Sequence, residues 1–311
     1  FGNGDRIILR GQDAKNDVTV DGVRSGAFLN RNEVYNIEQV EVTNGANSVM
    51  NGGGSVAGTI NLVTKRPLAD DQTILSAGIG TDNYYRGTVD ANKGVNDLTA
   101  ARTNAVYHEN DVPGRDVEDY KRWGIAPAVT IGIDGPTSLT LQGEYLDDKA
   151  MPQYGLRYYA NLGGFLDEFD REGYYGFANL DKQNSKTKSL QAIFSHEFSD
   201  TLKVRNLTRY ENIKQDTVTS QPNGTFCLAS TGLQPQSPFG GTASACTATV
   251  NGASITVPAG YYLPTGGRGV QRFISNTTAY NQFDISADFA TGGIQHAMVL
   301  GASALGERYR E

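Results

Sequence analysis

Long hydrophobic runs are missing from this 311-residue sequence. No apolar segment approaches the roughly 20 residues that a membrane-spanning helix requires. Only 38% of the residues are hydrophobic, yet the chain has 37 glycines, 16 tyrosines and 12 phenylalanines. A transmembrane β-barrel has such a composition, because only alternate residues face lipid and the lumen-facing residues are polar. If the chain lies in a membrane, the composition predicts that it crosses as strands.

Positive charge and histidine are also scarce. The net charge of −7 does not provide the basic face that nucleic-acid binding requires, so we expect no nucleic-acid partner. His108, His196 and His296 fall on separate expected strands without metal-ligand spacing. No nucleophile or acid/base set has a specific spacing either. We therefore expect a protein that is not an enzyme and that holds no metal or cofactor of its own.

Cysteine occurs only twice, as Cys227 and Cys246, within one segment rich in Gly, Ser, Thr and Pro. One interpretation is a disulfide that closes this loop in an oxidising compartment. The alternative is a pair of free thiols in a mobile loop.

Period-two alternation is present along much of the chain after residue 70. Leu139, Leu141, Gly143 and Tyr145 alternate with polar residues, a pattern typical of a strand with one apolar face. The only Trp, Trp123, lies near a strand end, where an interfacial aromatic girdle would place it. Strands are predicted near residues 72–81, 84–94, 98–110, 120–134, 138–148, 186–198, 201–215, 271–290 and 294–308.

The connections between these strands form two classes. Tight-turn sequences occupy 96–97, 134–137, 199–200 and 291–293. Between them fall the longer connections 111–119, 149–185 and 216–270, with the brief 81–83 as the exception. Outer-membrane barrels combine short periplasmic turns with long extracellular loops, so this interleaving predicts an orientation.

The first 67 residues carry four ordered sequence blocks. They are Arg10-Gly11, Asp21-Gly22-Val23-Arg24, the segment Ile37-Glu38-Gln39-Val40-Glu41-Val42 followed by Gly45, Ser48 and Gly52, and the segment 58–67, Gly-Thr-Ile-Asn-Leu-Val-Thr-Lys-Arg-Pro. In this order and at these distances the blocks resemble the plug domain of TonB-dependent siderophore receptors, with some similarity to the catecholate branch.

This resemblance implies an all-β or α+β plug with a transmembrane antiparallel β-barrel. Residues 1–70 would be the carboxyl-terminal part of the plug, and residues 71–311 the first part of the barrel with its extracellular loops. The family's barrel has 22 strands, so we expect the chain to be a fragment with about nine of them, beginning inside the plug.

The resemblance also implies a function, namely binding and import of a ferric siderophore across the bacterial outer membrane, with the iron carried inside the ligand. The implied partners are the siderophore, TonB with its inner-membrane energising complex, and outer-membrane lipid. One alternative keeps the fold and changes the cargo to cobalamin, heme or a saccharide. An alternative of another class is a passive porin or a surface adhesin.

The ligand-binding residues implied by the resemblance come from the plug apex and from one loop. The plug residues would be Arg24, Ser25, Gly26 and Asn51, although the family commonly has Tyr at the position of Asn51. In the loop 149–185 the candidates are Tyr154, Arg157, Tyr158 and Tyr159, because arginine and tyrosine suit an anionic chelate. The alternative is that these aromatic residues pack the loop against its neighbours.

A charge network is expected to hold the plug in place. Arg10 could pair with carboxylates of the plug or the barrel, and Glu38 and Glu41 are the natural partners on the plug side. Because buried charges require partners, a structural role is favoured over ligand contact.

Overall fold

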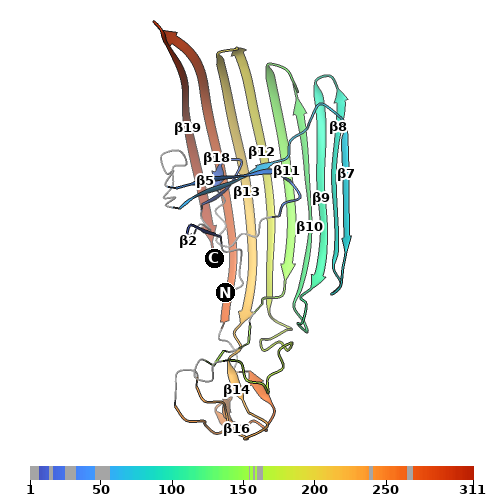
Figure 1. Cartoon of the computed structure of the whole chain (residues 1–311), viewed down its shortest axis with the longest axis vertical. Coiled ribbons are helices and arrows are strands. Elements are labelled where there is room, and N and C mark those ends of the chain that lie inside the picture. Colours follow the sequence, from blue (N-terminus) through green and yellow to red (C-terminus); the bar gives the residue numbers. More distant parts are fainter. Residues whose placement is uncertain are drawn as a thin grey trace.

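The chain forms one small sheet, one large sheet and a group of short hairpins beyond the end of the large sheet (Figure 1). The computed structural model describes residues 7–13, 17–24, 33–45, 57–153, 155–156, 158–159, 164–237, 241–264 and 269–311. Over these ranges no helix has the length and hydropathy needed to cross a membrane.

The large sheet contains the nine predicted strands, each paired antiparallel with its neighbour in sequence (Figure 1). This arrangement confirms the predicted partial antiparallel barrel wall. The strands are β7 (Gln72–Ile79), β8 (Tyr85–Asn96), β9 (Thr99–Asp111), β10 (Asp119–Ile131), β11 (Thr137–Ala150), β12 (Lys182–Ser199), β13 (Leu202–Ser220), β18 (Gly269–Thr291) and β19 (Ile294–Arg310).

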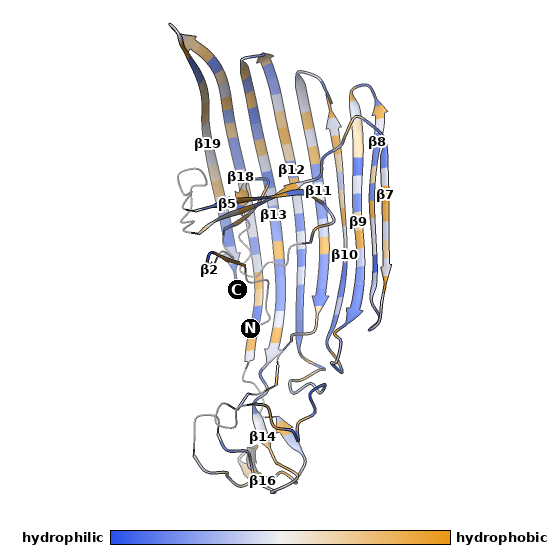
Figure 2. Ribbon diagram, in the orientation of Figure 1, coloured by the Kyte–Doolittle hydropathy of each residue, from blue (hydrophilic) through white to orange (hydrophobic). Residues whose placement is uncertain are grey.

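The two faces of this sheet differ in polarity, as the alternation in Figure 2 shows. On β11, Gln142 and Glu144 face the amino-terminal segment: Gln142 donates to the carbonyl of Lys65, and Glu144 accepts from the hydroxyl of Tyr35. Leu141 and Tyr145 therefore point to the opposite face. Trp123 lies on that outer face as well, is 45% exposed, and packs against Tyr145 with ring centroids 4.9 Å apart.

The structure also has the predicted alternation of short and long connections between strands. The turns after β8, β10, β12 and β18 are short and lie at one end of the sheet. The connections 112–118, 151–181 and 221–268 lie at the other end, which we call the loop end.

Several strands extend further toward the loop end than the sequence indicated. β12 begins at Lys182 and β13 continues to Ser220, so that Lys182 pairs with Val218. Residues 182–185 are polar at every position. The alternation disappears where both faces of the sheet meet polar surroundings. The predicted strands were for this reason too short at the loop end.

The small sheet has the strand order β4-β3-β6-β5 and consists of β3 (Val18–Val20), β4 (Val23–Arg24), β5 (Ile37–Asn44) and β6 (Gly58–Thr64). Asp21 and Gly22 form the tight turn between β3 and β4 with φ of 52° and 82°. Gly58 has φ of 140°, and a Cβ there would lie 2.2 Å from the carbonyl oxygen of Thr43. The first glycine of the block 58–67 is therefore required by close backbone approach. A further hairpin, β1 (Ile8–Leu9) and β2 (Gln12–Asp13), precedes this sheet.

Two long connections meet in what we call the loop module, which comprises the described parts of residues 151–181 and 221–268. It contains the hairpin β15 (Thr247–Val250) and β16 (Ala253–Thr256) and the pair β14 (Gly224–Phe226) and β17 (Tyr262–Pro264). None of these four strands was predicted, because each is only three or four residues long.

Candidate functional site

The small sheet lies against the inner face of the nine-stranded sheet, and ion pairs and hydrogen bonds make up much of the contact. Three polar clusters follow one another along this interface. Each joins a residue of the amino-terminal segment to side chains of two or more long strands.

The first cluster is centred on Glu33. Its carboxylate accepts hydrogen bonds from Arg86 at 2.7 Å and from Arg122 at 2.6 Å, and Arg122 also donates to Asp148 at 2.8 Å. The Glu33 side chain is only 5% exposed. Burial opposes ionisation, but the hydrogen bonds and charges of the two arginines outweigh it and lower the Glu33 pKa to about 2. Glu33 is therefore a fixed anion that ties the amino-terminal segment to β8 and β10.

The second cluster is centred on Arg102 of β9. Its guanidinium donates twice to Asp90, with both distances 2.7 Å, and also reaches Glu38 at 3.2 Å and the carbonyl of Arg66 at 2.8 Å. Lys65 approaches Asp90 to 3.0 Å. The Lys-Arg end of the block 58–67 is thus held directly by the inner face.

The third cluster surrounds Asp21. One carboxylate oxygen accepts from the backbone N–H of Thr64 at 3.0 Å. The other accepts from the hydroxyl of Thr64 at 2.6 Å and from the amide of Gln191 at 2.8 Å. Gln191 donates as well to Gln142, which itself donates to the carbonyl of Lys65 at 3.0 Å.

Apolar contacts at this interface are few and small. Tyr35 packs with Val106, Ala126 and Leu146, and its hydroxyl donates to Glu144 at 3.2 Å. Burial, followed by the nearby Glu144 charge, raises the Tyr35 pKa. Val23 packs separately against β12 and β13. An interface made of such groups can exchange its hydrogen bonds for water, which a tightly packed apolar core cannot do.

The predicted charge network is only partly present. Glu38 does pair with the barrel wall, through Arg102. Glu41 instead bonds Gln39 and Asn61 within its own sheet. Arg10 occupies the turn between β1 and β2, is exposed, and forms no ion pair within the described part of the chain. Among the described residues the three do not form one network, because Glu41 bonds within its own sheet and Arg10 forms no ion pair.

Of the predicted ligand residues of the plug, only Arg24 is among the described residues, and it does not lie near the loop end. Arg24 is paired with Asp17 at 3.1 Å, and the adjacent Val23 packs against Ile193 and Leu207, far along β12 and β13 from the loop end. Ser25, Gly26 and Asn51, together with Tyr154 and Arg157 of the loop, lie outside the described residues.

Tyr158 and Tyr159 have different environments. Tyr159 is 2% exposed, bonds Gly164 through its backbone, and lies edge-on to Phe169. Tyr158 is 54% exposed and forms a T-shaped pair with Phe165, with ring centroids 5.6 Å apart. Tyr159 therefore packs the loop, whereas Tyr158 and Phe165 offer flat aromatic surface to solvent.

A cavity of about 250 Å³ lies inside the loop module. Phe169, Tyr175, Phe226 and Tyr262 form part of its wall, and carboxylates of Glu168 and Asp170 also line it. Burial and the nearby Tyr175 raise the Tyr262 pKa to about 12. The acidic lining makes this cavity unsuitable for an anionic chelate.

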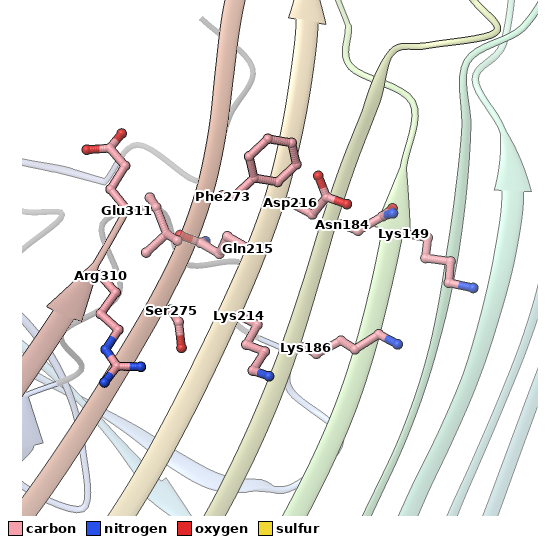
Figure 3. Close-up of a pocket in the computed structure, with 11 residues that line it drawn as sticks. Lys149, Asn184, Lys186, Lys214, Gln215, Asp216, Phe273, Ser275, Arg310 and Glu311 are labelled. Atoms are coloured by element: carbon pink, nitrogen blue, oxygen red, sulfur yellow. The ribbon is translucent and has the colours of Figure 1, made fainter.

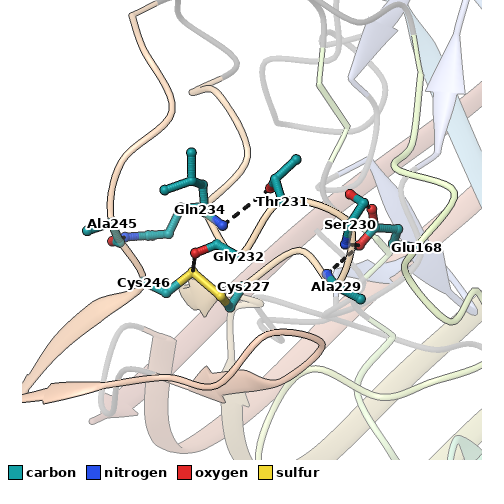
Figure 4. The surroundings of a disulfide bond; sticks show 10 residues. Glu168, Cys227, Ala229, Ser230, Thr231, Gly232, Gln234, Ala245 and Cys246 are labelled. Carbon is teal, nitrogen blue, oxygen red and sulfur yellow. Dashed lines mark hydrogen bonds between the residues drawn. A yellow bond between two sulfur atoms is a disulfide. The ribbon is translucent and has the colours of Figure 1, made fainter.

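Cys227 and Cys246 are joined in a disulfide with a Cα–Cα distance of 5.5 Å. Close by, Glu168 accepts from the backbone N–H of Ala229 at 2.6 Å and from the Ser230 hydroxyl (Figure 4). The covalent bond and the Glu168 contacts together fix one long connection and join it to the other.

Replacing Cys227 and Cys246 with serine should destabilise the loop module by about 3 kcal/mol, the cost typical of opening a loop of this size. Hydrogen exchange of β14 and β17 in the whole protein measures the effect. Amides of β9 and β10 serve as the internal control and should be unchanged. Equal protection of the module in variant and parent would contradict the expectation.

Sequence reasoning missed the most strongly held residues, Glu33, Arg102 and Arg122. The available signal was arginine within strands that otherwise alternate. Arg102 lies in β9 at a polar position of the inner face, but nothing in the sequence indicates that its partners are Asp90 and Glu38.

Residues 1–59 match the family described as TonB-dependent Receptor Plug Domain. The chain is 37% identical over 226 residues to the TonB-dependent siderophore receptor PiuA of Acinetobacter baumannii, covering 71% of this chain and 30% of that protein. It is 29% identical over 312 residues to the catecholate siderophore receptor Fiu of Escherichia coli K12, covering 96% of this chain and 37% of that protein.

The crystal structure of PiuA superimposes with a TM-score of 0.78 at 30% identity, covering 99% of this chain and 40% of that one. The chain therefore spans about a third of the length of the curated relatives that it matches.

Proposed function

Because this chain belongs to the TonB-dependent receptors, we propose that the whole protein binds a ferric siderophore at its loop end and admits it to the periplasm when the plug moves. The protein lies in the bacterial outer membrane as a β-barrel, and on this proposal residues 1–70 are the carboxyl-terminal part of its plug.

The single observation that carries the proposal is the polar interface between plug and barrel wall. A gate must be held closed, yet its displacement must not expose a large apolar surface to water. The Glu33, Arg102 and Asp21 clusters meet both conditions, because each bond is specific in the closed state and replaceable by water.

The exposed pair of Tyr158 and Phe165 supplies the binding surface that the described loops offer. Aromatic faces suit the flat rings of catecholate ligands. The names of the relatives PiuA and Fiu, a siderophore receptor and a catecholate siderophore receptor, support this choice of cargo.

Transport on this proposal makes and breaks no covalent bond. The substrate is a ferric chelate, so the iron is cargo. Displacement of the plug requires work from outside the protein, and we propose TonB with its inner-membrane complex as the source. The binding site itself has only to favour the loaded, closed state and to lose that preference when the plug shifts.

The test is growth of iron-starved cells on single purified siderophores. A strain lacking all other siderophore receptors would carry either the whole receptor or none. Rescue by catecholate chelates in the receptor strain alone is expected. Absence of rescue by any chelate, with the receptor present in the outer membrane, would refute the proposal and favour cobalamin, heme or a saccharide as cargo.

A passive porin is the rival of another class. The plug occupies the inner face of β8–β12 through ion pairs and hydrogen bonds, which leaves no reason for a porin to retain residues 1–67. Deleting that segment from the whole protein should raise its conductance strongly, whereas a porin would conduct as before.

A further inference from the structure

The cavity inside the loop module lies between the two long connections. Its volume of about 250 Å³ is well above the roughly 10 to 15 Å³ that one water molecule needs, and just below the roughly 300 to 1,000 Å³ of pockets for drug-sized ligands. Phe169 and Tyr175 come from one connection, and Phe226 and Tyr262 come from the other. The cavity therefore has room for a small organic molecule that contacts both connections.

Two carboxylates at this cavity are not neutralised by a cation. Glu168 accepts from the backbone N–H of Ala229 at 2.6 Å and from the hydroxyl of Ser230, which are both uncharged donors (Figure 4). Asp170 accepts from the backbone N–H of Glu172 at 3.0 Å. Among the described residues neither carboxylate forms an ion pair. The lining therefore carries unbalanced negative charge.

The backbone N–H groups around the cavity are already used as donors. The N–H of Ala229 donates to Glu168. Four others donate to carbonyl oxygens of their own connection, namely those of Cys227, Leu228, Gly260 and Tyr261. An anion would need free N–H or O–H donors, and these five groups provide none. A cation needs acceptors, which the two carboxylates provide.

The aromatic wall adds to the attraction for a cation. The hydroxyl of Tyr175 donates to the carbonyl of Asp170 at 2.9 Å. That of Tyr262 donates to the carbonyls of Tyr175 and Asn223. Both hydroxyl protons thus go to the backbone. Burial, followed by the Asp170 charge, raises the Tyr175 pKa. The faces of such neutral rings carry the negative part of the ring quadrupole and attract ammonium groups.

A second pocket near the loop end has a lining of the opposite charge (Figure 3). Its volume is about 860 Å³, and basic side chains extend from four strands around it, namely Lys149, Lys186, Lys214 and Arg310. Its two acids, Asp216 and Glu311, are each paired with a basic residue. Such a lining repels an ammonium group, so a cationic probe separates this pocket from the cavity of the loop module.

We propose that the cavity of the loop module binds the ammonium group of a small alkylamine, with Glu168 and Asp170 as its counter-ions and the ring faces as its apolar contact. The three N–H donors of a primary ammonium match the carboxylate oxygens, and the alkyl chain matches the rings. A metal ion fits less well, because the described residues include no group of three His, Cys, Asp or Glu side chains able to hold one. The inference goes beyond the proposed transport and does not depend on the cargo.

The test measures binding of n-butylammonium chloride to the whole receptor in detergent at neutral pH, by ligand-observed NMR titration. The uncharged n-butanol, of similar shape, is titrated in parallel, and calcium chloride is added as a competitor. The variant is Asp170→Asn, since an asparagine oxygen still accepts from Glu172. Asp167→Asn is the matched control, because the Asp167 side chain lies on the same segment, is 99% exposed, and pairs with Arg171 outside the cavity lining.

We expect Asp170→Asn to bind n-butylammonium about tenfold more weakly than the parent, as the loss of one hydrogen bond to a charged group implies. Asp167→Asn should bind like the parent, and n-butanol should bind the parent about tenfold more weakly than n-butylammonium does. In the parent, n-butylammonium at about ten times its dissociation constant should slow hydrogen exchange of β14 and β17 about tenfold, because it binds only the ordered module. Without ligand, exchange should be equal in the three proteins, which separates lost binding from a disturbed fold.

Equal binding of n-butylammonium and n-butanol by the parent would overturn the proposal, and this comparison needs no variant. Unchanged binding in Asp170→Asn would do so too. Equal weakening by Asp170→Asn and Asp167→Asn would assign the binding to the overall charge of the loops and overturn it as well. Displacement of n-butylammonium by an equal concentration of calcium would make the cavity a metal site, against the proposal. None of these measurements uses a siderophore, so their failure is distinguishable from failure of the proposed transport.

Discussion

Replacing Glu33 with glutamine should loosen the plug within the barrel by about 3 to 5 kcal/mol, the usual cost of removing one partner from a buried ion pair. Arg86 and Arg122 both donate to this carboxylate. A glutamine keeps the shape but removes the charge, so two partly buried guanidinium groups would compete for a neutral acceptor. Asp148 can compensate Arg122 only.

The same site predicts a dependence on pH with a definite sign. The Glu33 pKa is about 2 in the folded protein and 4.5 as its ordinary value. A lowered pKa means that the stabilisation is fully present above pH 4.5 and is lost as pH falls toward 2. The Glu33→Gln variant should lack this acid-dependent component, so the stability difference between parent and variant should shrink over that interval.

Two measurements on the whole receptor check the effect. Hydrogen exchange of β5 and β6 reports the stability of the plug, and conductance across a planar bilayer reports its displacement. Glu41→Gln is the matched control, because Glu41 is exposed and bonds only within its own sheet. If Glu33→Gln and Glu41→Gln behave alike, the Glu33 cluster does not hold the plug.

The nine long strands could be predicted because a barrel strand has one face toward lipid and one toward the barrel interior. Leu139, Leu141 and Tyr145 repeat at period two for that reason alone, and tight-turn residues separate the strands. The prediction missed the four residues from Lys182, where β12 extends beyond the apolar band and the two faces of the sheet no longer differ in polarity. The predicted strand ends therefore coincide with the end of the apolar band, although the backbone hydrogen bonds between the strands continue beyond it.

The plug interface could not be predicted from sequence, since its pairs join distant residues. Glu33 and Arg122 are 89 positions apart, and Asp21 and Gln191 are 170 apart. The local sequence around a carboxylate such as Glu38 or Glu41 is the same whether its partner lies on the barrel wall or in its own sheet. The partner of each carboxylate is decided by how the two sheets are aligned. The residue pattern of neither sheet encodes this alignment.

Adjacent tyrosines in the loop show the same limit at short range. Tyr158 and Tyr159 have the same chemistry and consecutive positions, but Tyr159 is buried near Phe169 while Tyr158 is exposed beside Phe165. The sequence could indicate an aromatic loop. It could not divide the loop into packing and contact residues, because that division depends on Phe226, which comes from the other long connection and stacks on Phe169.

Replacing Phe226 with alanine should destabilise the loop module by about 3 to 5 kcal/mol, as expected for a buried aromatic ring. Phe226 is 4% exposed, and its ring stacks on Phe169 and Tyr262 with centroids 4.5 Å and 4.1 Å away. Phe169 belongs to one long connection and Tyr262 to the other. Loss of the ring should therefore separate the two connections as well as create a cavity.

Hydrogen exchange of β14 and β17 measures the local destabilisation, and siderophore affinity of the whole receptor measures its consequence. We expect weaker binding, because the segment bearing Tyr158 and Phe165 must then be ordered at the expense of binding free energy. Tyr261→Ala is the control; its side chain is 67% exposed, so stability should change by no more than about 0.5 kcal/mol. A module that loses protection while affinity stays constant would show that the ligand is held by the plug and the barrel wall, and that the Tyr158–Phe165 surface is not part of the site.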